Sequence, residues 1–215
     1  MNQLPDQIHA YLQNHTLIPV SLGCSVAKVW RAVPKDSNSH IYYLKMNSLL
    51  YREELYHEYE ILSWLKDRLP VPKVISYLQT EQDDYLLTTE IAGVPACDVS
   101  LLHDPLKLTE LLASSLKLIH SLPIENCPFL ETNVIKLRKA QDYIRCGKIP
   151  NILLSPKGDQ RFTQDILDAL QRIVLRSEDL VFTHGDYCLP NVLFQDNKLS
   201  GFVIFNSNII RIWIL

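Results

Sequence analysis

The stretch Val181-Phe-Thr-His-Gly-Asp-Tyr-Cys-Leu-Pro-Asn-Val-Leu-Phe194 decides the fold, because it places chemically useful side chains between two apolar runs. The runs at residues 180–182 and 192–194 are short, apolar and bounded by turn residues, which predicts two buried strands. Between them, Asn191 follows Asp186 at a spacing of five. Gly, Asp, Pro and Asn are also common turn residues. The stretch alone therefore fits either a polar turn or a catalytic loop.

The spacing of Asp186 and Asn191 matches the catalytic loop of protein kinases. In that loop the Asp accepts the proton of the attacking hydroxyl, and the Asn holds a magnesium ion. Phosphoryl transfer needs both groups, because one carboxylate must face the nucleophile while a neutral oxygen ligand lies near the phosphates. The rest of the chain has to distinguish this loop from a turn.

The composition is that of an ordinary globular protein. The chain has 215 residues, of which 47% are hydrophobic and 21% charged, enough for one large domain or two small ones. Its formal net charge of −3 gives no basic surface for nucleic acid. Its five cysteines are scattered and form no Cys-x-x-Cys pair, so neither a disulfide framework nor a zinc site is predicted. A reducing cytoplasm is the expected location.

The two ends of the chain show no membrane-targeting pattern. The first residues lack both the basic and the apolar region of a signal peptide. The apolar run at residues 202–215 contains Asn206, Asn208 and Arg211, and it is shorter than the ~20 residues of a spanning helix. We therefore expect a soluble protein with no membrane partner.

The N-terminal part predicts a short helix at residues 5–13 and a strand in the second half of residues 20–33. Gly23 and Ser25 lie at the turn before that strand. Small residues let backbone N–H groups approach phosphate oxygens, so this turn is a candidate phosphate-covering loop. An ordinary hairpin turn explains the same residues.

A lysine and a glutamate on the next two elements form a candidate pair. Lys45 lies in an apolar strand predicted at residues 41–46, where a charge is costly without a partner. Glu58 lies on or beside the apolar stripe of a helix predicted at residues 53–65. A strand Lys and a helix Glu paired in this way hold the α- and β-phosphates in kinases. An edge lysine on a solvated face is the alternative.

The order of predicted elements gives a bilobal α+β plan. Strands at 69–75 and 85–91 complete a small antiparallel β lobe at residues 1–91. Residues 92–98 are predicted to be a linker. A helical lobe at residues 99–215 follows, with helices at 106–122, 133–145 and 165–176. A small β lobe, a linker and a helical lobe with a polar hairpin resemble a protein-kinase-like fold.

Several motifs, in the right order over about residues 20–203, resemble the aminoglycoside phosphotransferases and, within them, the 3′ class. These motifs are His184-Gly185-Asp186 with Asn191, Cys188-Leu189-Pro190, Leu69-Pro-Val-Pro-Lys-Val74, Ser63-Trp64-Leu65, Ile119-His120-Ser121 and Cys127-Pro128-Phe129. An ordered set is much more specific than any one motif. The resemblance implies an ATP-dependent enzyme that phosphorylates the 3′-hydroxyl of kanamycin- or neomycin-type antibiotics and so confers resistance.

The resemblance also implies a role for each matching residue, with ATP and Mg²⁺ as cofactors. Asp186 would be the catalytic base and Asn191 a magnesium ligand. Lys45, braced by Glu58, would contact the α- and β-phosphates. Ser25 would contact the β-phosphate, and Tyr43 would stack on the adenine. The backbone of Glu90 and Ile91 would form hydrogen bonds to the edge of the adenine.

The sequence departs from the family after residue 203. Family members continue Gly-Phe-Ile/Val-Asp-Leu-Gly, whereas here Gly201-Phe202-Val203 is followed by Ile204. The missing carboxylate is the family's second magnesium ligand. Family members also continue into C-terminal helices with acidic groups for the cationic drug, and we expect these helices to be missing. Both departures predict much reduced or absent phosphotransfer.

The tail at residues 205–215 has neither a helical nor an alternating period, so we interpret it as a lost reading frame or as damaged family sequence. Two alternatives stay open. One is a fragment that binds nucleotide without catalysis. The other is a kinase of the same superfamily that acts on choline, homoserine or a sugar.

Overall fold

The computed structural model describes residues 4–20, 27–36, 39–49, 52–129 and 180–203, with single residues at 135, 137, 138, 141, 142, 168, 169 and 172. The chain forms two compact units. The first comprises residues 1–119 and 184–208, and the second comprises 120–183 and 209–215. The expected helices at 133–145 and 165–176 fall almost wholly outside the described residues, as do Ser25 and Ile204. The lobe boundaries at residues 91 and 98 stay a prediction.

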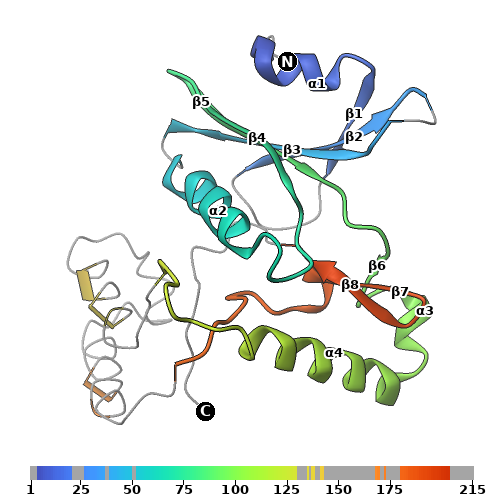
Figure 1. Ribbon diagram of the computed structural model, residues 1–215, viewed down its shortest axis with the longest axis vertical. Coiled ribbons are helices and arrows are strands. Elements are labelled where there is room, and N and C mark those ends of the chain that lie inside the picture. Colours follow the sequence, from blue (N-terminus) through green and yellow to red (C-terminus); the bar gives the residue numbers. More distant parts are fainter. Residues whose placement is uncertain are drawn as a thin grey trace, which may run out of the picture. The chain divides into compact units, whose positions relative to one another are not determined.

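An antiparallel five-stranded sheet dominates the first unit (Figure 1). Its strand order is β1-β2-β3-β5-β4, and each neighbour pair is antiparallel. The predicted small β lobe is confirmed, with one strand, β1, that the sequence reading did not anticipate. The strands are β1 (His15–Val20), β2 (Lys28–Pro34), β3 (Tyr42–Ser48), β4 (Val74–Gln79) and β5 (Asp83–Thr89).

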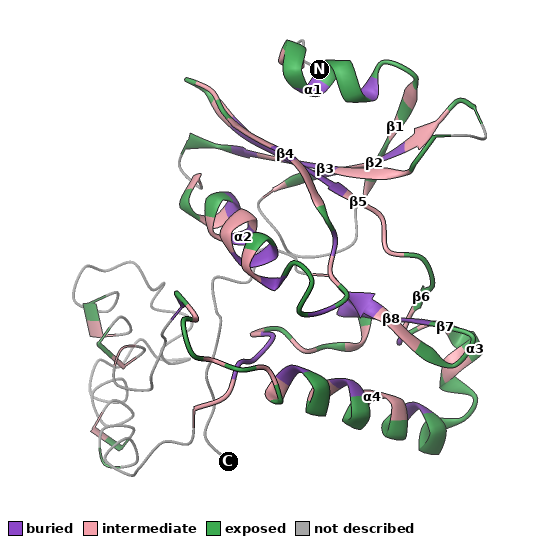
Figure 2. Cartoon of the chain, in the orientation of Figure 1, coloured by how far each residue is buried: buried purple, intermediate pink, exposed green. Residues whose placement is uncertain are grey.

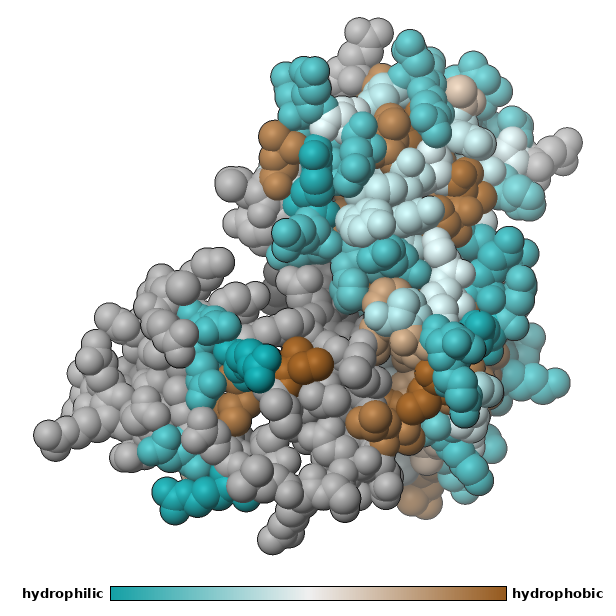
Figure 3. Space-filling view, turned by 60° about the vertical axis from the view of Figure 1, so that its left-hand side comes forward, coloured by the Kyte–Doolittle hydropathy of each residue, from teal (hydrophilic) through white to brown (hydrophobic). Residues whose placement is uncertain are grey.

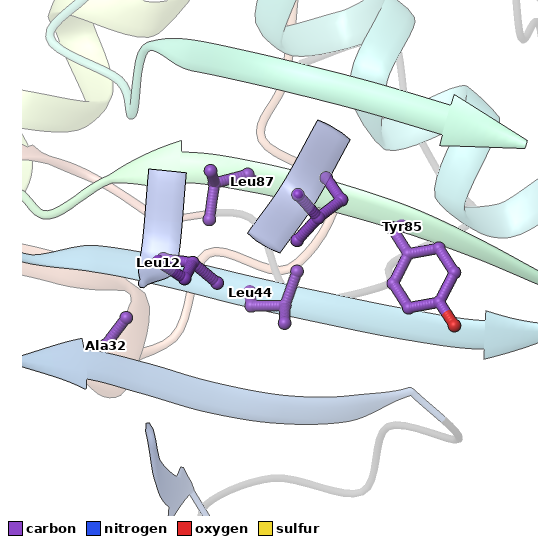
Figure 4. Close-up of a cluster of buried hydrophobic side chains, with 6 residues drawn as sticks. Leu12, Ala32, Leu44, Tyr85 and Leu87 are labelled. Atoms are coloured by element: carbon purple, nitrogen blue, oxygen red, sulfur yellow. The ribbon is translucent and has the colours of Figure 1, made fainter. Parts of the chain in front are cut away.

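Helix α1 (Asp6–Leu12) covers one face of this sheet, and it confirms the helix predicted at residues 5–13. Its two apolar residues lie four apart and are both buried, so they share one side of the helix. They pack against buried residues of β2, β3 and β5 (Figure 4). Full burial of each such side chain contributes about 2 kcal/mol. The buried cluster is Ile8, Leu12, Ala32, Leu44, Tyr85 and Leu87.

Helix α2 (Arg52–Leu65) contacts β3, β4 and β5. Its buried residues recur at helical spacing, as the sequence predicts, and include Leu55, Glu58 and Leu62. Figure 2 shows buried and exposed residues on different sides of the helix. Strand residues alternate between the two faces of a sheet, so Leu44 belongs to the cluster beneath α1 while Lys45 projects from the opposite face.

A second sheet has the strand order β6-β7-β8. The polar stretch after residue 183 leads directly into its strand β7. It consists of β6 (Val94–Pro95), β7 (Val192–Gln195) and β8 (Lys198–Phe202). The strand predicted at residues 192–194 is confirmed, but the one predicted at 180–182 is wrong, because those residues form no strand. Both edges of β7 are occupied by β6 and β8. The predicted linker at 92–98 thus contains a strand that pairs far along the chain.

Helices α3 (Val99–Leu102) and α4 (Pro105–His120) come next along the chain after β6. Helix α4 matches the helix predicted at 106–122. The Asp98 carboxylate caps α3 by accepting from the Ser100 N–H at 2.9 Å. Figure 3 shows hydrophobic residues in separate groups on one face of the described surface. Among the described residues, no helix is both long and apolar enough to cross a membrane.

Replacing Gly93 with alanine should destabilise the fold. Gly93 has φ of 113°, and an added Cβ would lie 2.6 Å from the backbone oxygen of Phe194 in β7. Such backbone strain costs roughly 1–3 kcal/mol. Urea denaturation of Gly93→Ala should show that loss. Asn197→Gly, at a turn residue with φ of 56°, is the control and should be neutral or slightly stabilising. Equal stability of Gly93→Ala and the parent chain would contradict this reading.

Candidate active site

Strand β3 carries two of the expected site residues on one face. Tyr43 and Lys45 are two residues apart in a regular strand, so both project from the face opposite Leu44. Lys45 is 5% exposed and Tyr43 is half-buried. A lysine this deeply buried needs an anionic partner.

Helix α2 supplies that partner. The Nζ atom of Lys45 donates to Oε1 of Glu58 at 2.5 Å, and both side chains are buried. The predicted pairing is confirmed. Burial raises the pKa of Glu58, and the adjacent Lys45 ammonium opposes that rise. A buried ion pair contributes little net stability, because desolvation offsets the attraction. The pair therefore points to a role in binding rather than in folding.

The segment that follows β5 adds a second group around Tyr43. Nε of Arg31 in β2 lies 2.7 Å from Oε1 of Glu90, and Arg31 is the cross-strand neighbour of Tyr43. Burial raises the pKa of Tyr43, so its ring stays neutral. The N–H of Glu90 already donates to the carbonyl of Ile41 at 3.1 Å. A hydrogen bond from the Glu90 backbone to a ligand would therefore use its carbonyl oxygen.

The residues between His184 and β7 form a tight polar loop. Nδ2 of Asn191 donates to Oδ2 of Asp186 at 2.9 Å and to its backbone oxygen at 3.0 Å. The N–H of Cys188 donates to the same backbone oxygen. Gly185 has φ of 81°, a conformation that favours glycine at this position. The loop presents Asp186 to solvent and buries Asn191. An exposed carboxylate beside a fixed amide suits a group that meets a substrate.

Two aromatic contacts and one hydrogen bond support this loop from behind. The His184 ring lies 6.1 Å from that of Tyr187 and 6.0 Å from that of Phe202. The hydroxyl of Tyr187 donates to the carbonyl of Leu112 in α4 at 2.7 Å. Burial raises the pKa of Tyr187 to about 12, so the phenol remains a donor at neutral pH. The loop is thereby attached to α4.

The structure brings the expected residues together in three groups. These are Lys45 with Glu58, Tyr43 with Glu90 through Arg31, and Asp186 with Asn191. Ser25 lies outside the described residues. A Cβ added to Gly201 would lie only 2.7 Å from Cδ1 of Ile91. This close approach of the Ile91 side chain explains the glycine in β8.

Reading the sequence missed two supporting residues, Arg31 and Tyr187. Arg31 is found only when the register of β2 and β3 is known, because that register sets it opposite Tyr43. Tyr187 is next to Asp186 in the sequence, but its partner is 75 residues away. No local sequence pattern predicts either contact.

The described residues offer a metal ion few ligands. No group of three or more His, Cys, Asp or Glu residues among them lies close enough to hold one. The amide nitrogen of Asn191 faces Asp186, which leaves its amide oxygen available to a cation. Magnesium accepts oxygen ligands and takes several of them from nucleotide phosphates. Asn191 therefore fits one place in a magnesium shell.

The sequence of this chain is similar to those of known phosphotransferases. Residues 16–205 match the model of the phosphotransferase enzyme family. The chain belongs to the aminoglycoside phosphotransferase family. It is 30% identical over 213 residues to an aminoglycoside 3′-phosphotransferase of Enterococcus faecalis, covering 94% of this chain and 77% of that protein. A second such enzyme, from Niallia circulans, is also 30% identical, with coverage of 93% and 75%.

Solved structures of aminoglycoside phosphotransferases share the fold. A type VIII 3′-phosphotransferase superposes with a TM-score of 0.72 at 25% identity, covering 90% of this chain and 72% of that one. A Streptomyces rimosus enzyme, solved with ADP and streptomycin, gives 0.68 at 24% identity, with coverage of 93% and 74%. The α+β kinase-like fold predicted from the sequence is confirmed.

Acidification should destabilise the fold through His184. Burial lowers the pKa of this histidine, although the Asp186 carboxylate opposes the effect. Below about pH 6.5 the unfolded chain binds a proton that the folded chain does not, so stability falls as pH falls, by up to about 1.4 kcal/mol per pH unit. Urea denaturation between pH 7 and 5 should show a steeper loss in the parent chain than in His184→Gln.

The exposed His103 provides the control for this measurement. His103→Gln should retain the pH dependence of the parent chain, because this substitution leaves the buried His184 ring in place. If His184→Gln and the parent chain lose stability in parallel, then His184 does not cause the loss.

Proposed function

We propose that this chain is an ATP-dependent phosphotransferase of the kind that confers resistance by acting on the 3′-hydroxyl of kanamycin- or neomycin-type aminoglycosides, and that its rate is reduced because the second magnesium carboxylate is missing. The observation that supports this most is the loop in which Asn191 fixes an exposed Asp186. The buried Lys45–Glu58 pair adds the phosphate-binding half of a kinase site. The 3′ assignment follows the names of the E. faecalis and N. circulans relatives.

The nucleotide site in this proposal lies on the Tyr43–Lys45 face of β3. Tyr43 stacks on the adenine, and the carbonyl of Glu90 and the backbone of Ile91 hydrogen-bond its edge. Lys45 contacts the α- and β-phosphates, and Ser25 contacts the β-phosphate. Glu58 keeps the Lys45 ammonium in place, because the hydrogen bond between them fixes the position of Nζ.

The reaction needs one proton acceptor. Asp186 accepts the proton of the 3′-hydroxyl as that oxygen bonds to the γ-phosphorus. The bond from the γ-phosphorus to the bridging oxygen breaks, and ADP leaves with the electron pair. Because Asp186 is exposed and its Oδ2 accepts from Asn191, the carboxylate is both accessible and oriented. Magnesium, when bound through Asn191 and the phosphates, would neutralise charge on the phosphate oxygens.

Ile204 is the reason to propose a reduced rate. In the family a carboxylate follows Gly-Phe-Val, and here an apolar residue takes that position. One amide oxygen does not replace a carboxylate for so hard a cation. The same observation favours a second candidate function, in which the chain binds nucleotide but does not transfer phosphate.

An assay of the purified 215-residue chain with ATP and kanamycin tests the proposal directly. Titration calorimetry should show ADP binding, and phosphorus NMR should detect slow formation of 3′-phosphorylated kanamycin. ADP binding without any product would favour the second candidate. Absence of ADP binding would contradict both. Rapid turnover would contradict the reduced rate, and transfer to choline or homoserine instead of kanamycin would contradict the substrate class.

Restoring the carboxylate should restore the response to magnesium. In Ile204→Asp, adding magnesium in place of EDTA should tighten ADP binding by roughly tenfold, about 1.4 kcal/mol. The parent chain and the neutral control Ile204→Asn should change little. A parent chain that already gains as much from magnesium would show that Ile204 does not weaken the metal site.

A further inference from the structure

The Lys45–Glu58 pair depends on how α2 is rotated about its own axis. Glu58 is six residues after Arg52, which places the two about 120° apart around the helix at about 100° per residue. A small rotation of α2 would carry the Glu58 carboxylate away from β3. A contact through Arg52, on a different side of the helix, would oppose that rotation.

Asp84 of β5 provides an anchor at the first turn of α2. Its side chain is fully buried, and its Oδ1 lies 2.9 Å from Nε of Arg52. Nη2 of the same arginine donates to the carbonyl of Thr80 at 2.6 Å. Arg52 therefore connects α2 to both ends of the turn between β4 and β5. Its planar guanidinium makes the two contacts with a fixed orientation.

The second oxygen of Asp84 is held by two residues of β4. Tyr77 donates its hydroxyl to Oδ2 at 3.0 Å, and Gln79 donates through Nε2 at 3.3 Å. Burial raises the pKa of Tyr77, so the phenol remains a donor. The carboxylate is thus the shared acceptor of three side chains, two from β4 and one from α2.

Stacked tyrosines continue this anchor along α2. The rings of Tyr59 and Tyr77 lie 4.7 Å apart and are nearly parallel, at 11°. Tyr56 lies 5.8 Å from Tyr77 at a tilt. Arg52, Tyr56 and Tyr59 recur at helical spacing, so they form one stripe that faces β4. Glu58 lies on the neighbouring stripe, with Leu55 and Leu62.

Stability alone does not explain the buried carboxylate. A buried ion pair is often no more stabilising than apolar residues of the same size, whereas its geometry is far more specific. Asp84 also lies directly across from Asn47 in β3, two residues after Lys45. The anchor and the phosphate-binding lysine therefore belong to the same pair of strands.

We propose that Asp84 is a positioning residue: through Arg52 and Tyr77 it fixes the rotation of α2 and so keeps Glu58 on Lys45. This inference rests on the proposed nucleotide site. It adds that the phosphate affinity of Lys45 is set by a residue that touches neither the lysine nor, in the proposed site, the nucleotide.

The test compares a ligand that has phosphates with one that lacks them. ADP and adenosine are titrated into the parent chain and Asp84→Asn, with EDTA present so that magnesium has no influence. Asp84→Asn should weaken ADP binding by about fivefold or more and leave adenosine binding unchanged, because Lys45 acts on the phosphates. In a Lys45→Met background the same substitution should have no effect on ADP binding.

Arg52→Gln serves as a second variant if Asp84→Asn does not fold, and it should give the same pattern, with Arg52→Lys recovering part of the affinity. Lys107→Gln, which breaks the exposed Lys107–Glu110 pair of α4, is the matched control and should bind ADP like the parent chain.

Three results would overturn the inference. They are equal weakening of ADP and adenosine, persistence of the ADP loss in the Lys45→Met background, and unchanged ADP binding in the variant that folds. A parent chain that binds no ADP would instead contradict the proposed function on which the inference rests.

Discussion

The arrangement of the candidate site depends on one buried ion pair, Lys45 with Glu58. Both charges have left water, so each needs the other, and breaking such a pair costs about 3–5 kcal/mol. That requirement constrains the elements around it: β3 must keep its register and α2 must keep its rotation. The cluster beneath α1 holds one face of the sheet, which leaves the other face to present the lysine. The pair therefore constrains the geometry of these elements while contributing little net stability.

The loop at residues 184–191 is ordered in a different way. Its polar atoms are fixed by short-range hydrogen bonds, such as those from Asn191 to Asp186, and its apolar neighbours anchor it to distant elements. Tyr187 reaches α4, and Phe202 of β8 lies against His184. The carboxylate can therefore stay exposed and still be well oriented. A mechanism that works mainly by positioning needs that combination.

Much of this was predictable from local sequence. Alternation and helical spacing located β2, β3, α2 and α4, and the apolar surroundings of Lys45 predicted an acidic partner, which is Glu58. Long-range pairing was not predictable. The apolar run at 180–182 has the composition of a strand, yet β6 and β8 occupy both edges of β7, and β6 lies in a segment expected to be a linker. Arg31 and Asp84 were missed because their hydrogen bonds join elements that are far apart in the sequence, which no single stretch records. The functional roles of the site residues remain predictions.

In the proposed function the buried Lys45–Glu58 pair serves phosphate binding and not folding. The most direct measurement is the thermal unfolding of Lys45→Met/Glu58→Leu, with and without ADP. We expect the double variant to unfold at the temperature of the parent chain or higher, because apolar residues replace a costly buried pair. We also expect that ADP no longer raises that temperature. A double variant that is strongly destabilised, and that ADP still stabilises, would contradict the claim.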